Sequence, residues 1–548
     1  MIITDFLERN ARLYGSEISL VEINPSEERD KAVTWWDFNL IESASQDAPY
    51  RREISWRDFD RRANRFANLF ANLLLSRGLK KGTKVAVLLM NCLEWLPIYF
   101  GILKAGCLAV PMNYRYSSDE IKYCLDLADV EVLVFGPEFV TRMDAIANDI
   151  PGVKMFYVGK DVPAYSEPCM ELMNFCSSSA PPVALTPDDD AAIYFSSGTT
   201  GFPKAILHKH RSLVHACLTE QNHHSQGRED VFLCIPPLYH TGAKMHWFGS
   251  LLSGSKAVLL RGVKPEWILR AVTEERCTIV WLLVPWAQDL LDAIDCGRVD
   301  LSMYRLDQWR LMHVGAQPVP PSLIHRWMKV FPHHEYDTNY GLSESIGPGC
   351  VHLGVANVRK VGAIGKPGFG WQTRIVDDHG NDVADGEVGE LIVKGDGVMT
   401  CYYKNEEATN EVLKDGWLYT GDMAKVDSEG FIYLVDRKKD VVISGGENLY
   451  PVQIEDFLRA YPKIKDVAVI GLPHARLGEI AAAIIEIKEG ETCTEEEIND
   501  FCQAMPRYKR PRKIFFAPVP RNPTGKIEKP ALREKYCQGR LVEQQIMG

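Results

Sequence analysis

The chain has 548 residues, of which 46% are hydrophobic and 25% are charged, close to the average for soluble globular proteins. This composition excludes collagen, coiled coil and disorder as the main architecture, and the length predicts more than one packed domain. The 62 basic and 73 acidic residues give a net charge of -11 without a dense basic tract. Nucleic acid is therefore not an expected partner.

The 14 cysteines are scattered, with neither a CxxC pair nor a small-domain disulfide framework, which indicates a reducing compartment. The amino terminus carries acidic residues early and does not read as a signal peptide. The most apolar run extends only from Thr278 to Ala287, far short of the ~20 residues that span a bilayer. We expect a cytoplasmic protein without a transmembrane segment.

Short apolar runs alternate with helical patterns over the first two thirds of the chain. We predict strands at 84–90, 109–112 and 130–136 with helices at 91–106 and 117–129 between them, and then strands at 256–262, 278–284 and 310–316 with helices at 265–277 and 320–331. This alternation is typical of parallel sheets covered by helices. Residues 26–55 fit no period and are expected to form a loop insertion.

The last third of the chain has a different pattern. Between 365 and 435 the helical patterns disappear, and we predict strands at 371–377, 389–395 and 431–436. The predicted fold is α/β. A large N-terminal domain, residues 1–435, contains two α/β layered subdomains and a small β-barrel at about 352–435, and a small α+β C-terminal domain covers 436–548.

The segment Ile193–Ala205, IYFSSGTTGFPKA, is the most informative one for chemistry. It contains Ser196, Ser197, Gly198, Thr199, Thr200 and Gly201, followed by Lys204. Glycines let backbone N–H groups converge on an anion, hydroxyls add donors, and a lysine supplies a compensating charge. The run predicts a polyphosphate loop that is not a Walker motif. The alternative is a Ser/Gly-rich surface turn.

Further segments follow in order. They are PPLYHTGA from Pro236, VGAQP from Val314, NYGLSES from Asn339, GWLYTGD from Gly416, DRKKDVVISGGENLYPVQIE from Asp436 and NPTGKI from Asn522. Together with the loop, these segments make the chain, from about 55 to 535, resemble the adenylate-forming superfamily of acyl-CoA synthetases, luciferases and peptide-synthetase adenylation domains. The resemblance implies a C-terminal domain that acts as a mobile lid and rotates about a hinge at Asp436.

The resemblance also implies a nucleotide site. The loop residues with Lys204 would hold the phosphates, Gly315, Ala316 and Gln317 would line the adenine, and the segment of Asn339, Tyr340, Gly341 and Ser343 would contact the nucleotide, with Tyr340 offering a flat face for the base. Asp422 would accept hydrogen bonds from the ribose hydroxyls beside Arg437. Glu344, with Thr199, would bind Mg²⁺, because a hard cation prefers carboxylate oxygen. Taken alone, Glu344 and Asp422 would be read as ordinary loop and turn residues.

Other implied roles concern the acid and CoA. His240 would orient or gate the carboxylate, Lys526 would contact the carboxylate and the α-phosphate, and Gly445 with Gly446 would face the pantetheine channel. The remaining histidines of interest are interpreted as structural: His208, His210, His223, His224, His333 and His334. An apolar acyl pocket without a fixed counter-charge is expected near Trp247, Trp281, Val284, Trp286, Gly315, Leu342 and Ile346, although the tryptophans could equally be core residues.

The expected function is an ATP-dependent carboxylic acid–CoA ligase that forms an acyl-adenylate and releases AMP and pyrophosphate. Medium or long aliphatic acids are the first choice, linked to fatty acid metabolism, and aryl acids are the second. A peptide-synthetase adenylation domain is disfavoured because Thr241, Gly242 and Ala243 offer no carboxylate for an amino group. A luciferase-like enzyme and an inactive nucleotide-binding scaffold are further alternatives, and a homodimer is left open.

Overall fold

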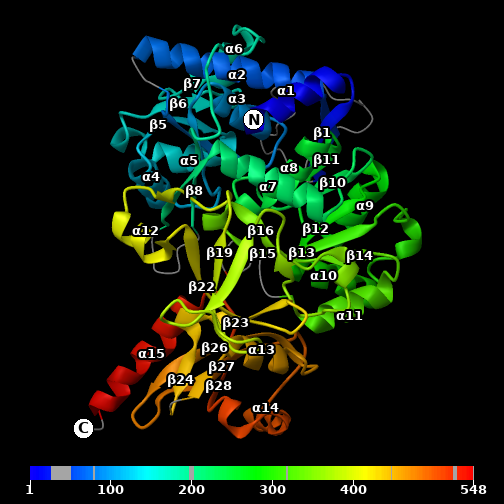
Figure 1. The fold of residues 1–548 in the computed structure, drawn as a ribbon, viewed down its shortest axis with the longest axis vertical. Coiled ribbons are helices and arrows are strands. Elements are labelled where there is room, and N and C mark those ends of the chain that lie inside the picture. Colours follow the sequence, from blue (N-terminus) through cyan, green and yellow to red (C-terminus); the bar gives the residue numbers. More distant parts are fainter. Residues whose placement is uncertain are drawn as a thin grey trace.

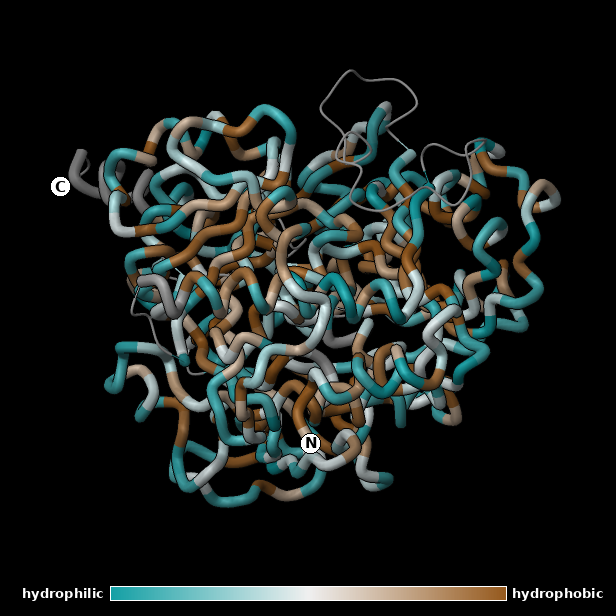
Figure 2. Tube along the Cα trace, turned by 90° about the horizontal axis from the view of Figure 1, so that it is seen from above, coloured by the Kyte–Doolittle hydropathy of each residue, from teal (hydrophilic) through white to brown (hydrophobic). Residues whose placement is uncertain are grey.

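A computed structural model of the chain describes residues 1–25, 51–77, 81–196, 203–315, 319–445, 447–521 and 527–546 (Figure 1). Predicted strands and helices appear where the alternating pattern places them. Hydrophobic residues concentrate in the interior and hydrophilic segments at the periphery (Figure 2). The predicted mixed α/β architecture, with a large N-terminal part and a small C-terminal one, is confirmed.

The first sheet has the strand order β20-β9-β8-β4-β3-β5-β6-β7. Its strands are β3 Lys84–Leu88, β4 Leu108–Pro111, β5 Val130–Phe135, β6 Lys154–Tyr157, β7 Glu167–Pro168, β8 Asp190–Phe195, β9 Ala205–Lys209 and β20 Cys401–Tyr402. The strands from β8 to β7 are parallel, whereas β9 and β20 run antiparallel to their neighbours. The central strands β3, β4 and β5 are mainly apolar and mostly buried, as a sheet covered by helices requires.

The helices of this part pack on one another and on the sheet. They are α2 Trp56–Arg77, α3 Trp95–Lys104, α4 Ser118–Leu127, α5 Val140–Asp144 and α6 Cys169–Asn174. Helix α3 packs on β3 and β4, and α2 packs on α3. Helix α4 begins where the sequence supplies a capping box, because Ser117 Oγ accepts from the Glu120 N–H at 3.3 Å and Glu120 Oε2 accepts from the Ser117 N–H at 2.7 Å.

The second sheet has the order β14-β13-β12-β10-β11-β1-β2. Its strands are β1 Ile18–Ile23, β2 Arg51–Ser55, β10 Val231–Cys234, β11 Lys256–Leu260, β12 Ile279–Leu283, β13 Leu311–Gly315 and β14 Glu335–Asp337. Its helices are α1 Ile3–Leu13, α7 His210–His223, α8 Thr241–Ser253, α9 Pro265–Glu275, α10 Val284–Asp295 and α11 Pro321–Val330. One hydrophobic core joins both sheets through residues such as Val87, Trp247 and Trp281.

The remaining strands form smaller sheets. They are β15 Asn339–Leu342, β16 Gly347–His352 and β17 Lys366–Pro367 in one sheet, and β18 Gln372–Val376, β19 Gly389–Lys394, β21 Leu413–Lys414, β22 Trp417–Val426 and β23 Ile432–Arg437 in the next. The C-terminal sheet contains β24 Val442–Ser444, β25 Glu447–Leu449, β26 Ile464–His474, β27 Gly478–Ile487 and β28 Lys513–Phe516, with helices α13 Pro451–Arg459, α14 Glu495–Phe501 and α15 Lys529–Ile546 (Figure 1).

Short 3₁₀ turns connect several elements: η3 Pro137–Phe139, η4 Ala147–Asp149, η5 Leu301–Met303, η6 Ser343–Ser345, η7 Val355–Asn357, η8 Lys438–Asp440, η9 Cys502–Ala504 and η10 Arg507–Lys509. Within the ranges described above, no helix is long and apolar enough to cross a membrane. The division at 435/436 stays a prediction.

Two sequence-based expectations are wrong. Helices do not disappear between 365 and 435, because α12 Glu406–Val412 forms there, capped by Asn405 Oδ1, which accepts from the Ala408 N–H at 2.9 Å. The expected loop insertion at 26–55 ends in a strand, since β2 pairs antiparallel with β1. Residues 26–50 lie outside the described residues.

Strand β2 carries a buried ion-pair cluster. The Arg52 guanidinium lies 2.6 Å from Glu22 Oε2 of β1 and 3.2 Å from Glu94 Oε1, at the start of α3. All three side chains are almost completely buried. The Arg52 guanidinium thereby compensates the charge of two buried carboxylates, one from β1 and one from the start of α3.

Replacing Arg52 by Met should therefore destabilise the fold by about 3–5 kcal/mol, because two buried carboxylates lose their cation. Denaturant unfolding measures the change. The control is Arg270→Met, which breaks an exposed pair with Glu274 and should change stability little. Equal stability of the two variants would contradict the role given to Arg52.

Candidate active site

The two ends of the predicted phosphate loop are joined by hydrogen bonds. Strand β8 leads into the loop and β9 leaves it, and the two strands pair antiparallel. The Lys204 N–H donates to Ser196 Oγ at 3.0 Å, and the Ser196 N–H donates to the Lys204 carbonyl at 3.0 Å. Ser197, Gly198, Thr199, Thr200 and Gly201 lie outside the described residues. The paired ends of β8 and β9 thus form the base of the segment that carries them.

Lys204 and Glu344 meet at Tyr402. The Lys204 Nζ lies 4.6 Å from the centroid of the Tyr402 ring, and the Tyr402 hydroxyl donates to Glu344 Oε1 at 2.8 Å. Burial, together with the Glu344 carboxylate, raises the pKa of Tyr402, so the phenol stays a neutral donor. Tyr402 was not predicted from the sequence, because a tyrosine in a short strand carries no signal of its own.

The Glu344 segment is held from several directions. The Met399 N–H donates to the Glu344 carbonyl at 2.8 Å. His208 Nε2 lies 2.8 Å from the Ser343 carbonyl, and burial lowers the pKa of His208 to about 4, so the neutral ring donates this hydrogen bond. Ser343 Oγ lies 3.5 Å from Thr241 Oγ1, which begins α8. His208, interpreted as structural, therefore positions the turn that bears Glu344.

A second set of predicted residues converges on Asp422. The Tyr340 hydroxyl donates to Asp422 Oδ2 at 2.5 Å, and Arg437 Nε lies 3.1 Å from Asp422 Oδ1. Asp422 and Arg437 are directly opposite each other in the β22–β23 pair. The charge of Asp422 raises the pKa of Arg437. The strand register thus explains how residues 422 and 437 form one carboxylate–guanidinium pair.

The residues predicted to line the adenine follow β13. Gly315 ends this strand, and a β-carbon at Gly315 would lie 3.5 Å from Asn339 Oδ1. The predicted Gly315 and Asn339 are therefore neighbours, while Gly341 lies in β15 next to Tyr340. Ala316 and Gln317 lie outside the described residues.

His240 caps helix α8. Its Nδ1 accepts from the Gly242 N–H at 3.2 Å, which fixes the ring at the helix start. A β-carbon at Gly242 would lie only 2.9 Å from Trp281 Cη2, so the glycine lets the tryptophan approach. Trp247 instead packs against Phe59 and Phe100 in the core, as the alternative interpretation of the tryptophans proposed.

Lys244, one turn after His240, was missed by sequence reasoning. Its side chain is fully buried, and Nζ lies 4.4 Å and 4.8 Å from the ring centroids of Tyr194 and Tyr99. Nζ also contacts the Leu238 carbonyl at 3.4 Å. Burial lowers the pKa of Lys244 well below its ordinary value.

The predicted hinge residue, Asp436, lies in β23 and contacts the start of α13. Asp436 Oδ1 accepts from the Arg437 N–H at 2.7 Å, and Oδ2 accepts from the Val452 N–H, in the first turn of α13, at 2.8 Å. Burial raises the pKa of Asp436 to about 6, against the opposing charge of Lys529. Gly445 has a φ of +62°, a conformation that favours glycine. Gly446 and Lys526 lie outside the described residues.

Comparisons with known proteins identify the family of this chain. The family model "AMP-binding enzyme" matches residues 36–403, and that of the AMP-binding enzyme C-terminal domain matches 453–526. The chain is 32% identical over 459 residues to the long-chain-fatty-acid–CoA ligase FadD13 of Mycobacterium tuberculosis, covering 83% of this chain and 88% of the relative. It is 32% identical over 455 residues to a 2-succinylbenzoate–CoA ligase of Bacillus cereus, covering 82% and 88%.

Solved structures share the fold. A Mycobacterium tuberculosis fatty acyl CoA synthetase aligns with a TM-score of 0.73 and 29% identity over 98% of this chain and 99% of that one. ATP-bound MatB from Rhodopseudomonas palustris aligns with a TM-score of 0.83 and 26% identity, again over 98% and 99%. The chain therefore belongs to the AMP-binding enzyme family, as an AMP-forming acyl-CoA synthetase of the adenylate-forming superfamily.

Proposed function

We propose that this enzyme joins a medium- or long-chain aliphatic acid to CoA through an acyl-adenylate, releasing AMP and pyrophosphate. The observation that carries the adenylation step is the convergence of Lys204, Tyr402 and Glu344 at the base of the 193–205 segment. The aliphatic choice is supported by the apolar Trp281 ring, which lies against Gly242 close to His240. The Mycobacterium tuberculosis relative is also named for long-chain fatty acids.

An aryl acid, or an acid with a second carboxylate, is the second candidate. Lys244 favours it, because a lysine buried among aromatic rings would keep its charge only with an anion close by. The Bacillus cereus relative is named for 2-succinylbenzoate, an aromatic dicarboxylate. Which carboxylic acid the enzyme prefers thus depends on whether the Lys244 ammonium reaches the bound substrate.

Asp422 and Arg437 would bind the ribose. The two carboxylate oxygens of Asp422 suit a diol, and Arg437 keeps this carboxylate charged and oriented. The Tyr340 hydroxyl, which donates to Asp422, holds the aromatic ring at the same place. Adenine would stack on this ring beside Gly315 and Asn339, with Ala316 and Gln317 completing the segment.

Lys204 and Glu344 would act on the phosphates. Both reactants are anions, so a cation placed in a site shielded from water offsets repulsion strongly. Glu344 presents a carboxylate of the kind that Mg²⁺ prefers, and Tyr402 hydrogen-bonds only one of its oxygens, so the residues present fit this ion. Glu344, with Thr199, would hold Mg²⁺, which when bound neutralises phosphate charge.

The acid and CoA would be handled by other residues. His240, fixed by its bond from Gly242, would orient the carboxylate toward the α-phosphorus. Lys526 would contact the carboxylate and the α-phosphate during adenylation. Rotation about Asp436 would then withdraw Lys526 and bring Gly445 and Gly446 to the pantetheine channel for thioester formation.

Substrate choice is tested by a panel of acids: octanoate, palmitate, benzoate and 2-succinylbenzoate, assayed by pyrophosphate release with and without CoA. We expect the highest kcat/KM with an aliphatic acid, and no selective effect of Lys244→Met on it. A preference for 2-succinylbenzoate that Lys244→Met abolishes would replace the aliphatic proposal by the second candidate. Pyrophosphate release without any acid dependence would contradict both.

The metal role is tested with Glu344→Gln. The substitution keeps the shape and removes the charge, so adenylation should need much more Mg²⁺ or fail, because a neutral amide is a poorer ligand for a hard cation. The measurement is a Mg²⁺ titration of pyrophosphate release. Tyr402→Phe keeps the Glu344 charge and serves as the matched variant. An unchanged Mg²⁺ requirement in Glu344→Gln would exclude Glu344 as the ligand.

The division of labour in the C-terminal domain is tested by separate half-reactions. Lys526→Ala should abolish acyl-adenylate formation but retain much of the conversion of supplied acyl-adenylate and CoA into thioester. Gly446→Trp should do the reverse, because a large side chain obstructs the thiol channel. Lys513→Ala, at an exposed strand position, controls for loss of a lysine. If both Lys526→Ala and Gly446→Trp impaired the same half-reaction, the proposal would be contradicted.

A further inference from the structure

Three side chains of types that bind metal ions meet in the core, although they come from distant segments of the chain. They lie behind Gly315 and Asn339, the residues predicted to contact the nucleotide. His224 follows α7, His313 lies in β13, and Asp337 ends β14. All three side chains are completely buried. Together they form what we call the His–Asp cluster.

The ligand atoms of the cluster lie at the corners of a small triangle. His224 Nε2 is 3.0 Å from His313 Nδ1 and 3.4 Å from Asp337 Oδ2, and His313 Nδ1 is 3.5 Å from the same oxygen. A tetrahedral zinc ion with bonds of about 2.0–2.2 Å separates its ligand atoms by about 3.3–3.6 Å. The triangle therefore has the size of one face of such a coordination shell.

The outer partners orient these ligands. His352 Nδ1 lies 3.0 Å from Asp337 Oδ2, and the Gly354 N–H donates to Asp337 Oδ1 at 2.8 Å. On the far side of the His224 ring, Nδ1 lies 3.7 Å from Glu220 Oε2. Metal-binding histidines characteristically face a carboxylate through their second nitrogen.

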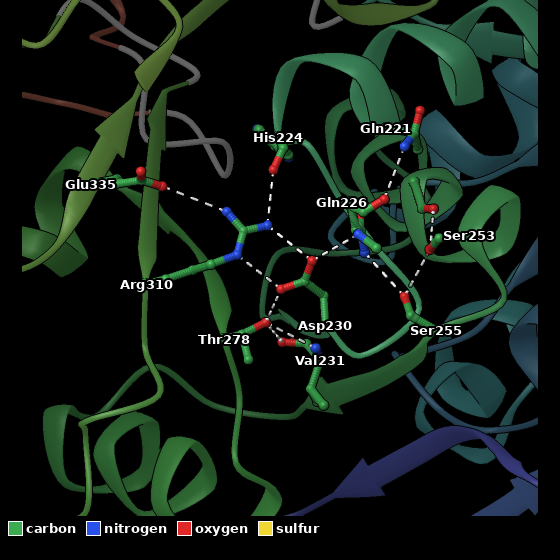
Figure 3. A network of polar contacts seen from close by, with 12 residues as sticks. Gln221, His224, Gln226, Asp230, Val231, Ser253, Ser255, Thr278, Arg310 and Glu335 are labelled. Carbon is green, nitrogen blue, oxygen red and sulfur yellow. Dashed lines mark hydrogen bonds and ion pairs between the residues drawn. The ribbon is translucent and has the colours of Figure 1, made fainter. Parts of the chain in front are cut away.

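A polar network outside the cluster fixes the backbone of two ligands (Figure 3). Arg310 pairs with Asp230 through two contacts of 2.9 Å and donates to the His224 carbonyl at 2.9 Å. Thr278 Oγ1 donates to Asp230 Oδ1 at 2.6 Å. Because Arg310 immediately precedes β13, the same guanidinium sets the position of His224 relative to His313.

The charges of the region also suit a cation. Asp337 and Glu220 are two carboxylates without solvent exposure, and buried charges are normally paired or coordinate a metal.

We propose that His224, His313 and Asp337 hold one divalent transition-metal ion of the zinc type. The nitrogen-rich donor set selects such an ion over Mg²⁺, which prefers oxygen ligands. A water molecule would take the remaining tetrahedral position. The ion would join the end of α7 to β13 and β14, directly behind Gly315 and Asn339, and this site is separate from the Mg²⁺ site at Glu344.

The test uses the full-length protein without a histidine tag. Elemental analysis after gel filtration should give about one equivalent of zinc or a similar metal per chain. After removal of the metal by a chelator, Co²⁺ alone should restore one equivalent with the visible absorption of a tetrahedral site, and should raise the melting temperature.

Three variants test whether the metal binds at the His–Asp cluster. His313→Gln should lose the bound metal and the Co²⁺ absorption. His210→Gln removes a histidine that is equally buried but lies outside the cluster, and it should retain both. His352→Gln keeps the three ligands but should weaken Co²⁺ binding by about 10–100-fold.

The competing arrangement is an ion pair of Asp337 with protonated His352, whose pKa Asp337 raises to about 9 despite burial. Under it, the purified protein would contain less than a tenth of an equivalent of metal and would neither bind Co²⁺ nor gain stability from it. That result on the wild-type protein overturns the proposal, whatever the folding of the variants. Metal retained in His313→Gln at wild-type affinity would overturn it as well.

Discussion

The pairing of β20 with β9 is the contact on which the arrangement of the nucleotide site depends. Residues 401–402 add to the edge of a sheet built from residues about two hundred positions earlier, and the Thr400 and Tyr403 N–H groups donate to the Leu207 and Ala205 carbonyls, both at 2.8 Å. Tyr402 is thereby placed between Lys204 and Glu344. This edge pairing, together with the contact of His208 in β9 with the Ser343 carbonyl, joins the segments that carry the Lys204 ammonium and the Glu344 carboxylate.

The α/β organisation was predictable because its strands and helices have clear periods. The 84–136 region alternates as expected, since β3 and β5 are mainly apolar runs and α4 carries its own capping box. The sequence did not predict α12, because seven residues give too little periodicity, nor β2, whose residues Arg51–Ser55 are mostly charged. Arg52 is buried only because Glu22 and Glu94 are supplied by other elements.

The candidate site was predictable where short motifs carry it. Lys204, Glu344, Asp422 and Arg437 were named from their segments, and the structure brings them together in two groups; their roles stay proposals. Tyr402 and Lys244 were missed because their positions follow from tertiary packing. The His–Asp cluster was missed for the same reason, since its members are separated by 89 and 24 positions and form no spacing motif. The cytoplasmic location and the homodimer stay predictions.

The place of β1 in the second sheet has a consequence for synthesis. Leu20 of β1 stands opposite Ala257 of β11 in a parallel pair, so the start of the chain cannot complete its sheet until residue 260 has left the ribosome. At 5–20 residues per second, translating the intervening segment takes roughly 12–50 s. During this interval β1 can pair with β2, but its other edge lacks β11. For this time the nascent chain can aggregate or bind a chaperone through the unpaired edge of β1. In the folded enzyme β11 covers this edge.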